Sequence, residues 1–307
     1  MKTLWRLTIS PSAEVGVDPR AFCLEHGLLG VGWPTGVGSG AEWKEYYNAG
    51  HVRYRLKGDK GWWPALNALR NRMSVNDLCW TRDRRGEYYL GRITGGWEYR
   101  ADAEHRRADV TNVRRCDWHK VGAVDGVPGK VVNSFRVSRT LQAVDHRGAR
   151  NYSQMLFNMM SGSELYPIAE VGPNILDLLL PEDLEDLVGI YLQNAGYRIV
   201  PSSCKRSTVA YEFVLIHHRT GERAVVQVKS GRVPIDADVL DGVADRVFLF
   251  AASGRYPGNL PEGTVCLKAE DLEDFLRRQP EVFPLRIRMW LKRLSLWGLS
   301  ETGTTHN

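Results

Sequence analysis

The sequence predicts a two-domain protein, in which an α+β N-terminal half precedes an α/β C-terminal half whose mixed central sheet is flanked by helices. Its 307 residues are about twice the length of a typical domain. Residues 1–150 carry 25 Lys and Arg against 16 Asp and Glu, a net of +9, whereas residues 151–307 carry 16 against 20, a net of −4. Eight of the ten tryptophans also lie in the first half. This asymmetry indicates that the first half contacts a polyanion, with a solvated basic surface and structural tryptophans as the alternative.

Apolar patterning and Gly or Pro punctuation define the elements of the first half. We expect, in chain order, a strand at Trp5–Ile9, a helix near Asp18–His26, a strand near Leu28–Trp33, helices at Ala41–Ala49 and Trp63–Arg72, and strands at Asp77–Thr81, Glu87–Ile93, Trp97–Tyr99, Val110–Val121 and Val131–Val137. The loop Gly36–Gly40 lacks the Gly-Lys-Ser/Thr ending of a phosphate-binding loop, so it does not indicate nucleotide binding.

The hairpin in this half carries a resemblance. Its segments Met73–Arg82 and Tyr88–Trp97, joined by a polar turn, are similar to the PUA-like group that includes EVE and YTH domains. The resemblance is assigned to residues 1–145 and implies a small β-barrel that reads nucleic acid. It also implies an aromatic pocket for one flipped base, because stacking on aromatic faces offsets the cost of extruding that base.

The resemblance and the residue types together give the candidate reader residues. They are Trp33, Trp62, Trp63, Trp80 and Trp97 for stacking, Asp77 or Asn76 for the polar edges of a base, and Arg82, Arg84 and Arg85 on the hairpin turn for backbone phosphates. For each tryptophan the alternative is a place in the core of a small barrel. Trp62 and Trp63 follow the loop-like run Lys57–Gly61, which favours exposure of at least one of them.

Residues 146–173 are expected to link the domains, with a short connecting helix at Tyr152–Met160, and residues 174–300 to form the second domain. That domain opens with an amphipathic helix at Pro181–Asn194. At about 100° per residue, its apolar stripe consists of Leu184, Leu187, Val188, Tyr191 and Leu192. Glu185 falls at the edge of this stripe, and Gly196 is the expected residue after the helix C-cap.

Two strands then bring polar side chains together. Tyr211–Ile216 and Ala224–Lys229 flank a turn centred near Thr220 and Gly221, where glycine suits a positive φ. Side chains alternate along a strand, so Gln227 and Lys229 share one face of an apolar strand, where they require partners. Folding the hairpin about its turn brings Glu212 opposite Gln227 within a residue or two.

The order Glu185, Glu212, Gln227, Lys229, with the run Leu184–Tyr197 around the first of them, resembles the Mrr-type restriction endonuclease domain of the PD-(D/E)xK superfamily. The resemblance spans about Leu176 to Trp290. It implies a restriction-endonuclease-like fold and a catalytic centre made of those four residues. Two features depart from the family pattern: Glu212 replaces the usual Asp, and Ser202–Thr208 replaces a glycine-rich approach.

The resemblance implies hydrolysis of DNA phosphodiester bonds that depends on Mg²⁺ or Mn²⁺. The metal would be held by Glu212, the Gln227 side-chain carbonyl, the Val228 backbone carbonyl and Glu185, since Mg²⁺ prefers such hard oxygens. Lys229 would orient or deprotonate the attacking water. Taken singly, Lys229 paired with Glu212 and a solvated Glu185 are the ordinary alternatives.

The function expected of the whole chain is a modification-dependent DNA endonuclease of prokaryotic defence, acting as a homodimer or by transient pairing on DNA. The alternatives are a non-catalytic binder of modified nucleic acid with a degenerate nuclease domain, and an RNA-directed protein. Further elements are expected at Asp238–Ala244 (helix), Arg246–Ala252 (strand), Val265–Leu267 (strand), Asp271–Arg278 (helix) and Pro284–Trp297 (helix).

The remaining features concern the compartment. The five scattered cysteines contain no CxxC pair, which argues against a zinc ribbon and a disulfide framework. We find no signal sequence and no apolar run near the ~20 residues of a membrane span. A cytoplasmic location without membrane contact is therefore expected.

Overall fold

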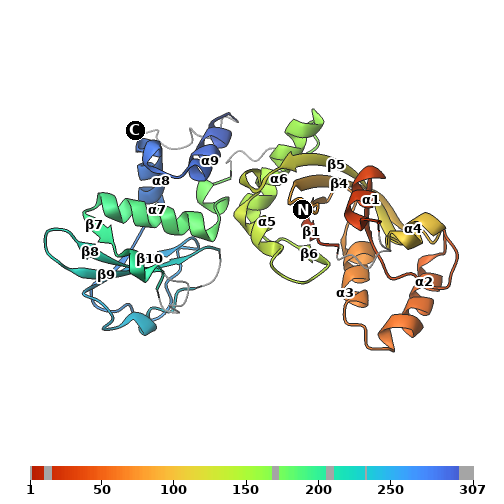
Figure 1. Cartoon of the computed structure of the whole chain (residues 1–307), viewed down its shortest axis with the longest axis horizontal. Helices are drawn as coiled ribbons and strands as arrows, with labels where there is room; N and C mark the ends of the chain where they lie inside the picture. Colours follow the sequence, from red (N-terminus) through yellow and green to blue (C-terminus); the bar gives the residue numbers. More distant parts are fainter. Residues whose placement is uncertain (1, 10–15, 168–172, 205–210, 232–233, 297–307) are drawn as a thin grey trace. The chain divides into compact units, whose positions relative to one another are not determined.

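The computed structural model describes residues 2–9, 16–167, 173–204, 211–231 and 234–296. Contacts divide the chain into two compact units (Figure 1). The first unit comprises residues 1–127 and 131–170, and the second comprises residues 128–130 and 171–307. Each unit contains one mixed sheet and helices, so the chain is α+β. Part of the expected linker (168–172), part of Ser202–Thr208 and Trp297 lie outside the described residues.

The first unit contains six strands and their helices, although residues 129 and 130, which begin its helix at 129–134, are counted with the second unit. In chain order these are β1 (Leu4–Leu7), α1 (Pro19–Glu25), β2 (Leu28–Val31), α2 (Trp43–Gly50), the π-helical η1 (His51–Arg55), α3 (Trp62–Asn67), the π-helical η2 (Ala68–Arg72), β3 (Leu78–Arg82), β4 (Tyr88–Tyr99), α4 (Ala103–Arg107), β5 (Asn112–Gly122), the 3-10 turn η3 (Val124–Gly126), α5 (Gly129–Ser134), β6 (Leu141–Ala143) and α6 (Arg147–Ser161).

The sheet of the first unit has the strand order β2-β5-β4-β3-β1-β6. β1 pairs parallel with β3, and the other neighbours are antiparallel. Among the described residues the edge strands β2 and β6 do not pair with each other, so the closed barrel that the resemblance implies is not found there. The core beneath the sheet is rich in aromatic residues, including Trp5, Tyr46, Trp62 and Tyr99.

The expected linker contains a helix that belongs to the first unit. α6 is longer than the short connecting helix that we expected, and it packs on β4 and β5. Its Tyr152 hydroxyl donates to the Gly126 carbonyl at 3.0 Å, and its Ser153 hydroxyl accepts from Trp80 Nε1 at 2.9 Å. Because these contacts bury one face of the helix, residues 147–161 are part of the unit.

Two strand predictions in this half need correction. Val131–Val137 does not form a strand, since residues 129–134 are the helix α5; the buried side chains of Val131 and Phe135 are four residues apart, which is helical spacing. The expected strands Glu87–Ile93 and Trp97–Tyr99 are one strand, β4, whose register against β5 shifts between Ile93 and Trp97. A β-bulge of this kind keeps a strand continuous while it re-aims side chains.

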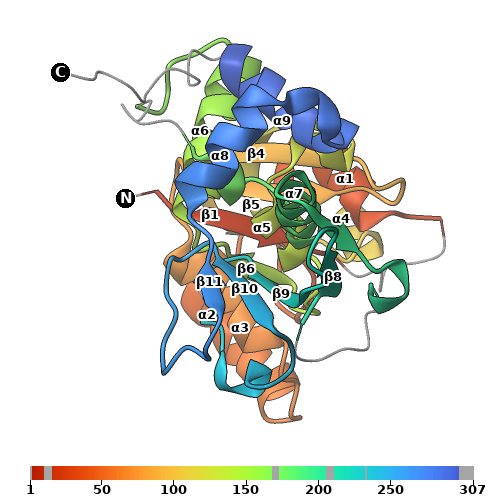
Figure 2. The ribbon, with the colours of Figure 1, turned by 90° about the vertical axis from the view of Figure 1, so that its left-hand side faces the viewer.

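The second unit contains five strands in the order β11-β10-β9-β8-β7. Its elements are the 3-10 turn η4 (Ile175–Asp177), α7 (Pro181–Asn194), β7 (Tyr197–Ile199), the 3-10 turn η5 (Pro201–Ser203), β8 (Phe213–His217), β9 (Arg223–Lys229), the 3-10 turn η6 (Asp238–Leu240), β10 (Arg246–Ala251), β11 (Thr264–Cys266), α8 (Ala269–Arg278), the 3-10 turn η7 (Pro280–Val282) and α9 (Leu285–Leu296). β9 lies at the centre, antiparallel to β8 and parallel to β10 (Figure 2). The helix expected at Asp238–Ala244 is only a 3-10 turn, because the backbone is already extended at Asp241, and Gly242 follows with a φ of +66°.

Helix α7 runs along the sheet of the second unit (Figure 1). Gly189 lets it approach closely, because a Cβ there would lie 3.2 Å from Ile199 Cδ1 and 3.3 Å from the Phe213 ring. At its start, buried Asp183 accepts a hydrogen bond from the Leu180 backbone N–H at 3.1 Å and pairs with Arg286 of α9 at 2.6 Å. These contacts fix the helix that carries Glu185. Within the described residues no helix combines the length and apolar character needed to cross a membrane.

Candidate active site

The hairpin of β8 and β9 sets the framework of the candidate site. Phe213 pairs with Val226, and the Glu212 backbone N–H donates to the Val226 carbonyl at 2.8 Å. In an antiparallel register this pairing puts Glu212 across from Gln227. The turn between the strands contains Gly221 with a φ of +75°, as the sequence predicts. The prediction that these two residues face each other is confirmed.

The side chains of this pair are in contact. Gln227 Nε2 donates a hydrogen bond of 2.6 Å to Glu212 Oε1, and Lys229 Nζ lies 3.7 Å from the same oxygen. Gln227 is 4% exposed, so the hydrogen bond satisfies an amide that burial would otherwise penalise. Lys229 and Glu212 are partly exposed, which leaves the cluster open to a ligand.

Glu185 on α7 belongs to the same electrostatic group. Burial is the largest cause that raises its pKa, and the charges of Glu212, Glu182 and Asp186 raise it further, to about 7. The Lys229 ammonium acts in the opposite direction. The stripe predicted for α7 is confirmed: Leu184, Leu187, Val188 and Leu192 are buried and Tyr191 is half-buried. Glu185 lies between them and solvent, where Glu212 and Lys229 affect its charge.

Hard oxygen atoms converge at the end of β9. The Gln227 amide nitrogen lies 2.6 Å from Glu212 Oε1 and 3.4 Å from the Val228 carbonyl oxygen, so both oxygens face one point. Turning the amide over would add its own oxygen to this set. No group of three or more His, Cys, Asp and Glu suited to a metal occurs among the described residues. The candidate set has two carboxylates and takes its other oxygens from an amide and the backbone, which fits a hard cation such as Mg²⁺.

Three candidate reader residues lie in the core of the first unit rather than at its surface. Trp62 and Trp80 are at most 1% exposed, and Asp77 is 2% exposed. Asp77 Oδ1 accepts from the Thr3 backbone at 2.9 Å and Oδ2 accepts from Trp5 Nε1 at 2.9 Å. A carboxylate engaged in this way holds β1 against β3 and is not available to a base edge.

Trp33 and Trp63 are half-buried beside the helical hairpin. Trp33 has a φ of +65° and donates from Nε1 to Asp59 Oδ2 at 3.0 Å. Trp63 packs edge-on against Tyr47 with a centroid separation of 5.5 Å. Both side chains brace the α2–α3 hairpin.

The three arginines of the β3–β4 turn differ in their surroundings. The Arg82 guanidinium lies 5.1 Å from the centroid of the Phe135 ring. Exposed Arg84 pairs with Asp18 at 3.1 Å, and Arg85 is exposed. The prediction that they meet phosphates remains open for Arg85 above all, since the side chains of the other two are engaged.

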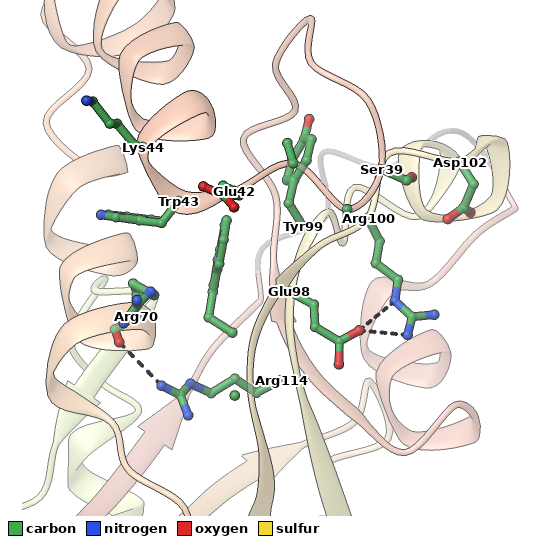
Figure 3. Close-up of a pocket in the computed structure, with 14 residues that line it drawn as sticks. Ser39, Glu42, Trp43, Lys44, Arg70, Glu98, Tyr99, Arg100, Asp102 and Arg114 are labelled. Atoms are coloured by element: carbon green, nitrogen blue, oxygen red, sulfur yellow. Dashed lines mark hydrogen bonds and ion pairs between the residues drawn. The ribbon is translucent and has the colours of Figure 1, made fainter.

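Trp97 lines a pocket of about 990 Å³ in the first unit (Figure 3). Trp43 contributes a second ring, and the two rings meet edge to face with centroids 5.1 Å apart. Arg70 lies 5.7 Å from the Trp43 centroid. Figure 3 shows Trp43 and Arg70 on one side and Glu98, Tyr99 and Arg100 on the other. Trp43 and Arg70 were not predicted as site residues, although both fall in predicted helices, at Ala41–Ala49 and Trp63–Arg72.

Buried polar groups fix the walls of this pocket. Arg114 donates to the carbonyl oxygens of Leu69 at 2.6 Å, Gly95 at 3.0 Å and Arg70 at 3.3 Å. Trp97 Nε1 donates to Asn112 Oδ1 at 3.2 Å. The indole of Trp97 and the η2 backbone are therefore held in place, and the pocket offers two aromatic rings on a rigid support.

Comparison with known proteins gives no further assignment. No family model, no curated protein and no solved structure matches this chain.

Proposed function

We propose that the chain is a metal-dependent DNA endonuclease whose chemistry resides in the second unit. The observation that carries this proposal is that Gln227 and Lys229 both approach one carboxylate oxygen of Glu212. Burial and the charge of Glu212 also raise the pKa of Glu185 to about 7. A carboxyl group with a strongly raised pKa beside other charged side chains is typical of functional sites. The proposal includes a PUA-like fold for the first unit and a restriction-endonuclease-like fold for the second.

Each residue has a role in phosphodiester hydrolysis. Glu212, Glu185, the Gln227 carbonyl and the Val228 carbonyl would hold Mg²⁺ or Mn²⁺, which would neutralise charge at the scissile phosphate and activate water. The Lys229 ammonium, partly exposed beside Glu212, orients the attacking water and stabilises the negative charge that develops on the phosphate. Glu212 holds the lysine in place. Burial, and after it the charge of Glu212, raises the pKa of Glu185 to about 7, which makes Glu185 a second proton acceptor near neutral pH.

A cleavage assay with matched variants tests the proposal. Purified full-length protein with Mg²⁺ is incubated with DNA that is unmodified or carries cytosine or adenine modifications. Lys229→Ala should reduce the cleavage rate by about 100-fold or more, as expected for loss of a group that stabilises transition-state charge. Lys268→Ala removes an exposed lysine of the same unit and should cleave like the wild type. Cleavage that persists in Lys229→Ala would contradict the assignment.

One active site per chain has a consequence for double-strand cleavage. Because the proposed site contains a single Lys229, cutting both strands requires two chains, as a homodimer or by pairing on DNA. The cleavage rate should then rise more steeply than linearly with protein concentration. Nicked circles as the sole product at all concentrations would restrict the proposal to single-strand cleavage.

A second candidate function is base reading in the first unit, and the Trp43–Trp97 pocket favours it. Two aromatic faces with nearby cations suit a flat heterocycle joined to phosphates. Trp43→Ala should therefore lower the preference for one modified DNA over unmodified DNA. Trp63→Ala removes a half-buried tryptophan of the same hairpin outside the pocket and serves as the control. Equal affinity for all modified and unmodified DNAs would sink this function.

The same assays separate the alternatives. Binding to modified nucleic acid without cleavage in Mg²⁺ or Mn²⁺ would identify a non-catalytic binder with a degenerate nuclease domain. Competition by RNA that displaces DNA at equal concentration would identify an RNA-directed protein. Prokaryotic defence against foreign DNA is the role that modification-dependent cleavage would serve.

A further inference from the structure

The helical hairpin of α2 and α3 carries a concentrated positive charge at its tip, defined here as residues 51–61. In both views α2 and α3, drawn in orange, extend away from the sheet of the first unit (Figures 1 and 2). The tip contains four exposed cationic side chains, those of Arg53, Arg55, Lys57 and Lys60. None of the four forms an ion pair with another residue in the part of the chain that the structure describes.

The tip has one acidic residue, Asp59, and its carboxylate is engaged internally. Oδ1 accepts from the backbone N–H groups of Gly61 at 2.8 Å and Trp62 at 3.0 Å, and Oδ2 accepts from Trp33 Nε1 at 3.0 Å. Burial opposes ionisation of this carboxyl, but the hydrogen bonds outweigh burial and hold its pKa below the usual range. Asp59 therefore organises the tip and leaves the four cations to face solvent.

The tip is anchored at its base, unlike a loosely solvated loop. The Tyr54 hydroxyl donates to the Pro34 carbonyl, and the Tyr54 ring stacks on Trp62 with centroids 6.4 Å apart. Trp33, which reaches Asp59, adopts a φ of +65°, a conformation that costs a non-glycine residue free energy. The same residue donates the hydrogen bond that fixes the Asp59 carboxylate, so the tip is held in a defined position.

Two apolar side chains accompany the charges. Val52 and Leu56 are 63% and 69% exposed. They are four positions apart in the sequence, so they lie on one side of the helix. Two side chains make a small apolar surface compared with the continuous face by which an interfacial helix inserts into a membrane. They suit contact with the sugar edges of a nucleic acid between phosphates that meet the basic side chains.

We propose that the hairpin tip is a docking surface for the phosphate backbone of double-stranded DNA, with Arg53, Arg55, Lys57 and Lys60 as the contacting cations. This inference rests on the proposed function for the choice of DNA as the polyanion. It places the main backbone contact of the first unit on the α2–α3 hairpin instead of the β3–β4 turn. Charge complementarity is the basis, since residues 43–72 contain seven Lys and Arg but two Asp and Glu.

Binding measured without catalysis tests the docking surface. Full-length protein is titrated into a short fluorescent DNA duplex in EDTA over a series of salt concentrations, and anisotropy is recorded. The tip variant Arg55→Gln/Lys57→Gln should bind DNA about tenfold more weakly at physiological salt. The negative slope of log K against log salt should become less steep by about two. The control Arg107→Gln/Arg139→Gln removes two exposed cations of the same unit and should leave the slope unchanged.

The outcomes are distinct. Equal slopes for the tip variant, the control and the wild type would overturn the docking surface, as would absence of DNA binding by the wild type. If the tip variant lost binding to phosphatidylserine vesicles but bound DNA like the wild type, the docking surface would also be overturned, in favour of a membrane-binding surface. Because the titration needs no cleavage, a protein that binds through the tip but does not cut DNA would leave this inference standing while the nuclease proposal fails.

Discussion

Gln227 and Glu212 face each other across the β8–β9 hairpin, joined by a hydrogen bond of 2.6 Å from the amide nitrogen to the carboxylate. This contact links Gln227 of the central strand β9 to Glu212, the residue that directly precedes β8. Lys229 approaches the same carboxylate from two residues further along β9. A buried amide, a carboxylate and an ammonium group thus form one cluster, and removing Glu212 breaks both contacts that hold it together.

Replacing Glu212 by Ala should destabilise the second unit. The Gln227 amide, 4% exposed, would lose its nearer acceptor and keep only the long contact of 3.4 Å to the Val228 carbonyl, and a poorly satisfied buried donor costs about 1–3 kcal/mol. Urea unfolding of the full-length variant measures this loss. The control Glu262→Ala removes an exposed carboxylate of the same unit and should change the free energy of unfolding by less than about 0.5 kcal/mol. Similar values for both variants would show that water replaces the lost acceptor.

The free energy of unfolding should fall as pH rises through the titration range of Glu185. Its pKa is about 7 in the folded chain against an ordinary value of 4.5, so the folded state holds more protons than the unfolded state between these values. This stabilising protonation is fully present below about pH 4.5 and is lost above about pH 7.

Glu185→Gln removes the titration and should flatten this profile. Above about pH 8 the variant should be more stable than the wild type by about 1–2 kcal/mol. This value is smaller than the full pKa shift would give, because solvent screens a carboxyl that is only half-buried. Asp274→Asn, at an exposed acid of the same unit, serves as the control. Parallel profiles for Glu185→Gln and the wild type would refute the raised pKa.

Metal binding should release a proton below neutral pH. Because Glu185 holds a proton up to about pH 7, Mg²⁺ that binds its carboxylate must displace that proton. The apparent affinity should rise with pH to about 7 and then level off. Calorimetry in two buffers of different ionisation enthalpy counts the released protons. Glu185→Gln should bind Mg²⁺ more weakly and without proton release, whereas a wild-type affinity independent of pH would exclude Glu185 as a ligand.

Gly91→Ala should destabilise the first unit. A Cβ at this position of β4 would lie 2.4 Å from the Trp118 ring and 2.5 Å from Cys116 Sγ, so two side chains of β5 must move. Overpacking of this kind costs about 1–3 kcal/mol. Thermal unfolding gives the comparison with Gly96→Ala on the same strand, where a Cβ meets nothing within 4 Å. A melting temperature equal to that of the control would mean that β5 yields without strain.

The second unit follows from its sequence more closely than the first, because its signals are local. Glu212, Gln227 and Lys229 are joined by a hairpin whose turn glycine and alternating strands set the register. Glu185 follows from the helical period of α7, and Gly196, with a φ of +99°, ends that helix as expected. The order of β9, β10 and β11 depends on parallel pairings over long connections, which no local pattern specifies.

In the first unit, composition identified the aromatic and basic character but not its distribution. Trp80 and Trp97 both lie in regular strands, yet Trp80 is buried beneath α6 while Trp97 lines the pocket after the bulge in β4. The bulge changes the face to which residues point, and no sequence pattern marks it. The role of Arg114 could not be predicted from the sequence, because it depends on the backbone carbonyls of Leu69, Arg70 and Gly95, which are distant in the chain.

The two-residue period of β9 constrains how the hairpin can be altered. Sliding β9 by a single residue relative to β8 would turn Gln227 and Lys229 away from Glu212 and expose Val226 and Val228 in their place. A slide of two residues would restore the face but replace the partner of Glu212. An insertion in the turn at residues 218–221 is therefore tolerated only if the pairing register of β8 and β9 stays unchanged. Insertions there would measure how strongly this register is fixed.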